Sequence, residues 1–156
     1  MTDDPAALVD ELIAARADFL AAVDALTPAR LSSARLVGDW GARELVAHLG
    51  YWAGHAVEGI HAVETGRADE AGAGEPAVDD VNATVARVAR MADLATARTR
   101  EAASVQALLE RLATVDPALL SVLLPDGETL AQAVRQDGAE HYAEHAADLR
   151  SAAGDR

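Results

Sequence analysis

The chain has 156 residues, a typical size for one folded domain, and 51% of them are hydrophobic. It contains no cysteine, which excludes disulfides, thiolate metal ligands and a cysteine nucleophile, so any thiol chemistry must use a bound small molecule. Its 26 acidic residues outnumber 13 arginines, and the formal charge of −13 disfavours nucleic acid and an anionic membrane surface as partners.

The N-terminal segment MTDDPAALVDELIAARADFL has the pattern of an amphipathic helix. It begins with acidic residues and lacks the basic start and the apolar run of a signal peptide. The sequence contains no run of about 18 apolar residues, which is the length that a transmembrane helix needs. We therefore expect a cytoplasmic protein in which residues 1–156 form one domain.

The first predicted helix begins at Pro5 and ends before Thr27-Pro28. Asp4 is the expected N-cap, and proline is favoured at the first position of a helix. A short accessory helix is predicted at 28–32, in the connector that follows. One apolar face at helical spacing is made of Leu8, Leu12, Ile13, Phe19, Leu20 and Val23.

The second predicted helix follows Trp40 and runs to about Thr65. Gly41 is its expected N-cap, and Glu44 stands three residues later, where the acid of a capping box lies. Residues 66–76, GRADEAGAGEP, contain three glycines and one proline and form the clearest loop. Helix connections in bundles usually take about 2–8 residues, so this longer link is compatible with a crossover at the end of a bundle.

Residues 77–115 have helical periodicity almost throughout, but one helix of that span would be about 57 Å long. That length exceeds a domain of this size, so we expect a break near Met91–Asp93. The last predicted helix opens at Thr129, with Gln132 in capping-box spacing, and runs to about Ala152. No strand-like alternation occurs in the sequence. The predicted fold class is all-α, a four-helix bundle with one short accessory helix.

His141 and His145 stand four residues apart in the segment EHYAEHAADLR of the last helix. This spacing places two imidazoles on one helix face, about 6 Å apart along the axis, so one metal ion can contact both. A catalytic zinc typically has three protein ligands, so the third must come from another helix. His48, in the apolar run LVAHLGYW, is a candidate, and a buried histidine without a metal is the alternative. His55 and His61 are expected at the rim.

The segments GDWGARELVAHLGYW and EHYAEHAADLR, in their order and spacing, resemble the DinB/YfiT-like superfamily of four-helix-bundle proteins. Two branches are most similar: the N-terminal domain of mycothiol-dependent maleylpyruvate isomerases, and the ClbS/DfsB-like group, whose members end in a similar HYxEH segment. The resemblance implies an up-down-down-up bundle with a long crossover between the second and third helices. It also implies a divalent metal site formed here by His48, His141 and His145.

The function that this resemblance implies is a metal-dependent transferase or isomerase that joins a thiol to an electrophilic small molecule, as in detoxification. Zinc is the favoured metal, and nickel or iron would also accept three imidazoles. Mycothiol is the implied thiol, and basic residues that are all arginine are typical of a high-GC, actinobacterial host. The alternative from the ClbS-like branch is a metal-independent resistance protein that sequesters or hydrolyses a reactive natural product. A third hypothesis is a bundle that serves dimerisation or a stress response.

Three further residues are candidates for shaping the site. Trp52 stands one turn after His48 and is expected to wall a pocket, with simple core packing as the alternative. Glu44 and Glu144 could each accept a hydrogen bond from the second ring N–H of a ligating histidine, as carboxylates often do, with solvated helix faces as the alternative. Alanine-rich faces also favour a homodimer.

Overall fold

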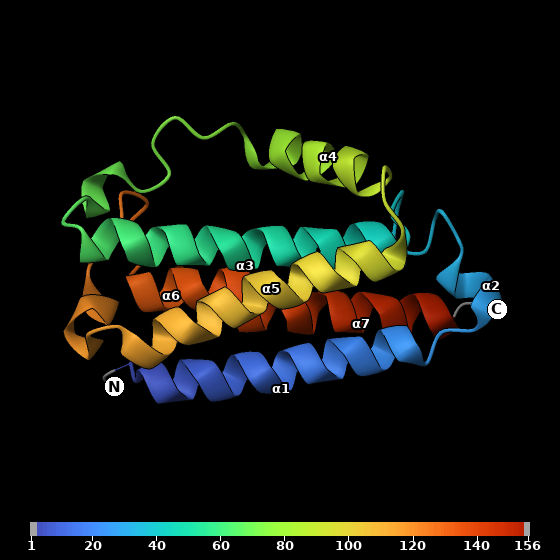
Figure 1. Ribbon diagram of the computed structural model, residues 1–156, viewed down its shortest axis with the longest axis horizontal. Helices are drawn as coiled ribbons and strands as arrows, with labels where there is room; N and C mark the ends of the chain where they lie inside the picture. Colours follow the sequence, from blue (N-terminus) through green and yellow to red (C-terminus); the bar gives the residue numbers. More distant parts are fainter. Residues whose placement is uncertain (1–2, 155–156) are drawn as a thin grey trace.

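The computed structural model describes residues 3–154, and the regular secondary structure within this range is helical. Four long helical segments lie side by side (Figure 1). The sequence analysis predicted an all-α bundle, and the structure confirms it. Within the described range, no helix combines the length and apolar character that a membrane span requires. The four segments are α1 (Pro5–Asp24), α3 (Ala42–Glu64), α5 (Leu94–Thr114) and the pair α6 (Leu130–Arg135) and α7 (His141–Gly154).

The helices are connected in the predicted up-down-down-up order. In Figure 1, α1 and α7 run in one direction, whereas α3 and α5 run in the opposite direction. Two consecutive parallel helices need a connection along the whole bundle, and residues 65–93 provide it. This crossover contains the 3₁₀ turn η1 (Ala68–Glu70) and the helix α4 (Val78–Ala89), which packs against α3 outside the bundle. The predicted accessory helix is α2 (Pro28–Leu31).

Capping residues begin the helices where the sequence predicted. The Asp4 side chain accepts a hydrogen bond from the backbone of Ala6 at 3.0 Å. Thr129 and Gln132 form a complete capping box at the start of α6. At the start of α3 only the return half of the box forms, because glycine has no side chain: the backbone N–H of Gly41 donates to Glu44 Oε2 at 3.0 Å.

One predicted helical region is divided as expected, and another contains an unexpected departure from α-helical geometry. The break expected near Met91–Asp93 is present, but it separates α5 from a helix that belongs to the crossover. The last helix was expected to be regular from Thr129 onward. Instead, a π-helical segment, η3 (Gln136–Glu140), lies between α6 and α7, and Gly138 adopts φ −110° and ψ −106° inside it. Such π-bulges are frequent at functional sites.

A buried carboxylate joins three of the long helices. Glu101 on α5 is only 1% exposed. Arg16 on α1 donates to its Oε1 at 2.7 Å and to its Oε2 at 2.8 Å, and the hydroxyl of Tyr142 on α7 also donates to Oε1. Burial and the adjacent Glu101 carboxylate raise the pKa of Tyr142, so this hydroxyl keeps the proton that it donates. These bonds compensate a charge that would be costly to bury alone.

Helix α3 approaches α5 most closely at a glycine. A Cβ atom built on Gly50 would lie 2.9 Å from the Cα atom of Glu101, a backbone atom that cannot rotate away. A Cβ atom on Gly54, one turn later, would instead have Ser104 Oγ at 4.0 Å as its nearest neighbour. The backbone of Glu101 is therefore packed directly against α3 while its side chain holds α1 and α7.

These two glycines give a matched test of the helix packing. Gly50→Ala should lower the free energy of unfolding by about 1–3 kcal/mol, because it forces α3 and α5 apart. Gly54→Ala should leave the free energy of unfolding unchanged or raise it by up to about 1 kcal/mol. Alanine is the better helix former, and a Cβ atom at this position has room. Urea unfolding followed by circular dichroism measures both. Equal effects of the two substitutions would contradict the close approach at Gly50.

Candidate metal centre

Three histidines that are far apart in the sequence meet between α3 and α7. One ring nitrogen from each of His48, His141 and His145 lies within 4.8 Å of the other two. His48 comes from α3, whereas His141 and His145 occupy one face of α7, as their spacing predicted. The Nε2 atoms of His48 and His141 are 2.7 Å apart. The structure thus brings together the three histidines that the sequence analysis selected, in a group that could hold a metal ion.

The environment of this group keeps at least two of its imidazoles neutral at pH 7. Burial lowers the pKa of His48 to about 3, and the neighbouring His141 and His145 add to the effect. Burial also lowers the pKa of His141 to about 4, with a further contribution from His145. A neutral imidazole has a free lone pair on one ring nitrogen, which is the form that binds a metal.

One histidine is oriented by a carboxylate. Nδ1 of His145 lies 2.9 Å from Oδ2 of Asp148, one turn further along α7. A carboxylate in its ionised form can only accept, so Nδ1 is the donor, and in a neutral ring this leaves the lone pair of Nε2 for a ligand. By contrast, Nδ1 of His48 is buried and has no hydrogen-bond partner among the described residues.

The two glutamates named from the sequence have different positions. The carboxylate of Glu44 is buried, accepts from the backbone of Gly41, and lies within ion-pair distance of Arg43 and Arg90. These contacts hold it at the start of α3 and account for its burial without His48. Glu144 is exposed and lines the cleft beside the histidines.

The histidines open into a cleft of about 570 Å³. Trp40 and Trp52 form part of its wall, and their rings lie 4.8 and 6.5 Å, respectively, from the ring of His48. The indole N–H of Trp52 donates to Oδ1 of Asn82 on α4 at 3.0 Å, so this wall is anchored to the crossover. Trp52 therefore lines the pocket, as the sequence analysis expected.

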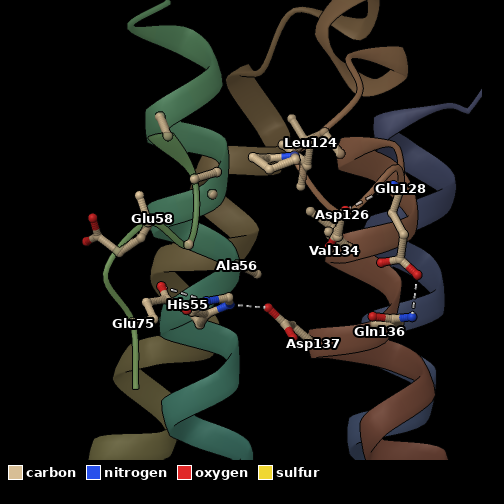
Figure 2. A pocket seen from close by; sticks show the side chains of 18 of the residues that line it. His55, Ala56, Glu58, Glu75, Leu124, Asp126, Glu128, Val134, Gln136 and Asp137 are labelled. Atoms are coloured by element: carbon tan, nitrogen blue, oxygen red, sulfur yellow. Dashed lines mark hydrogen bonds and ion pairs between the residues drawn. The ribbon is translucent and has the colours of Figure 1, made fainter. Parts of the chain in front are cut away.

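A second cavity, whose lining side chains are drawn in Figure 2, has a volume of about 700 Å³. Its lining comes from α3, from residues 67–78 of the crossover, which we call the crossover loop, and from residues 124–137. The two spaces are neighbours because four residues line both of them: Trp52, Val78, Gln136 and Asp137. A ligand in the histidine cleft could therefore extend under the crossover loop.

His55 has a more specific environment than the rim position expected from the sequence. Its Nδ1 lies 2.6 Å from Oδ2 of Asp137 in the π-helical segment, and its Nε2 lies 3.1 Å from both carboxylate oxygens of Glu75 on the crossover loop (Figure 2). The hydrogen bond with Asp137 is the main cause that raises the pKa of His55 to about 9. Nothing local in the sequence indicates these partners, which stand 20 and 82 residues away.

The fold and the site define a helical-bundle protein with a three-histidine group between two facing helices. The chain belongs to the DinB superfamily, whose family model matches residues 5–148. No curated protein matches the sequence.

Two solved structures are similar to this chain in fold. An uncharacterised protein from Escherichia coli UTI89 has a TM-score of 0.81 and 13% identity, over 96% of this chain and 92% of that one. A mycothiol-dependent maleylpyruvate isomerase has a TM-score of 0.75 and 16% identity, over 94% of this chain. The match spans 61% of the isomerase. At these identities the similarity establishes the fold.

The pKa of His55 predicts how stability depends on pH. Its pKa is about 9 in the folded protein, against 6.5 for an ordinary histidine. The charged imidazolium therefore contributes its full stabilisation below about pH 6.5 and loses it as the pH rises through about 9. The difference in unfolding free energy between the parent and His55→Gln should be largest near pH 6 and smallest near about pH 10. Urea unfolding at a series of pH values measures it, and a difference that grows with pH would contradict this assignment.

Proposed function

We propose that this protein binds a divalent metal through His48, His141 and His145 and uses it to activate a thiol against an electrophilic small molecule. The observation that carries the proposal is the convergence of three ring nitrogens, within 4.8 Å of one another, on the wall of a cleft. Ionisable groups that converge in a cleft with strongly perturbed pKa values are typical of functional sites.

The residues present fit a metal. Zinc lies about 2.0–2.1 Å from imidazole nitrogen, so two nitrogens on a tetrahedral zinc are about 3.3 Å apart. His48 and His141, at 2.7 Å, need a small outward shift to reach this separation. His145 already has the carboxylate partner that ligating histidines usually have. Zinc is favoured, and the three-nitrogen donor set would also accept nickel or iron.

A divalent metal bound here would lower the pKa of a thiol or water in contact with it, which supplies a nucleophile at neutral pH. Three protein ligands would leave a position open for that group. The chain has no cysteine, so the thiol must be a small molecule. Mycothiol is the candidate, supported by the similarity in fold to a mycothiol-dependent isomerase. The wall formed by Trp40 and Trp52 would orient the substrate beside the histidines.

A second candidate function is metal-independent binding or hydrolysis of a reactive small molecule. It is favoured by the hydrogen-bond distance between the Nε2 atoms of His48 and His141, which pairs the two histidines without an ion. The adjoining cavity of about 700 Å³ offers room for a ligand. Cytoplasmic location and a homodimer remain predictions under either function.

Metal content distinguishes the two candidates. The untagged parent should purify with, or take up, about one equivalent of zinc, nickel or iron, because a three-ligand site holds one ion. His48→Ala and His141→Ala should each lose it, whereas His61→Ala on the same helix as His48 should retain it. Elemental analysis and calorimetric titration with each ion measure the content, and thermal unfolding confirms that the variants fold. A parent that takes up none of these ions would contradict the metal function and leave the second candidate.

A further inference from the structure

Asp137 lies where the histidine cleft meets the adjoining cavity, and it lines both. It belongs to the π-helical segment, one turn before His141. Its side chain is 17% exposed. This position gives a half-buried carboxylate access to a molecule bound beside the three histidines.

The Asp137 side chain is held by a chain of two contacts. His55 on α3 approaches its Oδ2 through Nδ1 at 2.6 Å, and Glu75 approaches the opposite nitrogen of the same ring at 3.1 Å (Figure 2). Because both ring nitrogens face carboxylates, each of them is a donor and the imidazole carries a positive charge. The contact to Asp137 uses Oδ2, which leaves Oδ1 to interact with a ligand.

The charged residues around Asp137 and His55 come from three parts of the chain. On α3, Glu58 and His61 line the same cavity, and on the crossover loop, Arg67, Glu70 and Glu75 do so. The turn before α6 adds Asp126 and Glu128. Glu128 accepts from the side chain of Gln136 at 2.8 Å, and Arg67 forms an ion pair with Glu70 at 3.9 Å. Among the described charged residues that line this cavity, only Asp137 lines the histidine cleft as well.

We propose that Asp137 is the acid–base group that serves the three-histidine centre, and that His55 and Glu75 position it. This inference rests on the proposed thiol chemistry and names the residue that moves the proton in it. Burial raises the pKa of Asp137, opposed by the hydrogen bond from His55. A carboxylate with a raised pKa is a better base towards a thiol than an ordinary surface aspartate.

The proton balance of the step is simple. Asp137 Oδ1 takes the S–H proton of the thiol, and the sulfur keeps the electron pair of that bond. The sulfur then forms a bond to one carbon of an activated alkene, and the π-electron pair of the alkene moves to the neighbouring carbon. Asp137 returns its proton to that carbon, which regenerates the carboxylate. The thiol and the alkene are the only reactants, and no oxidant or reductant is required.

Glu140 and Glu144 are the other carboxylates of the cleft. Both are exposed. Asp137 differs from them in its burial and in its imidazolium partner. These differences make Glu140→Gln and Glu144→Gln the appropriate comparison variants for Asp137→Asn.

Two measurements test the proposal. In the first, calorimetry counts the protons released when N-acetylcysteine binds to zinc-loaded protein, in buffers of different ionisation enthalpy. The parent should release fewer protons than Asp137→Asn at mildly acidic pH, because Asp137 retains the thiol proton. In the second, carboxyl ¹³C NMR of the metal-free protein follows Asp137. His55→Gln should raise the pKa of Asp137, and Glu75→Gln should lower the pKa of His55.

The outcomes separate this proposal from the function on which it rests. Addition of N-acetylcysteine to diethyl maleate should fall about 100-fold in Asp137→Asn, the usual scale of general acid–base catalysis. In His55→Gln, the acid limb of the pH–rate profile for this addition should move to higher pH. Equal proton release by the parent and Asp137→Asn, or a larger loss in Glu140→Gln or Glu144→Gln, would overturn the role of Asp137 while the metal function stands. A parent that takes up none of zinc, nickel and iron would refute both.

Discussion

The buried carboxylate of Glu101 is the interaction on which the arrangement of this bundle depends. It is held by Arg16 from α1 and Tyr142 from α7, while its own backbone packs against Gly50 of α3. All four long helical segments therefore meet at one residue. Because a buried charge is tolerated only with good partners, the contacts fix how α7 is rotated and placed relative to α3.

The rotation of α7 decides where the functional side chains lie. Tyr142 points into the core, and on an α-helix the adjacent His141 points about 100° away from it, towards the cleft. Asp137, in the π-helical segment one turn before His141, lines the same cleft. One helix thus presents a core anchor, two candidate metal ligands and a candidate acid–base group. The placement of these side chains follows from the packing of Tyr142 in the core.

Much of this could be predicted from local signals in the sequence. Capping residues, apolar periodicity and the glycine-rich loop identify the helices, and the four-residue spacing identifies the pair His141 and His145. The grouping with His48 followed from a family resemblance. The π-helical segment and the environment of His55 could not be predicted, because they depend on contacts between distant residues. Gly138 is the one local feature of the sequence that marks the π-helical segment, and isolated glycines in helices have many causes.

The central claim is that His48, His141 and His145 together hold one metal ion. X-ray absorption spectroscopy of the zinc-loaded protein tests it most directly, because the spectrum reports the number, type and distance of the ligands. The account predicts three imidazole nitrogens at about 2.0–2.1 Å and at least one further light-atom ligand from solvent or thiol. A spectrum with oxygen ligands alone, or with fewer than three imidazoles, would contradict it.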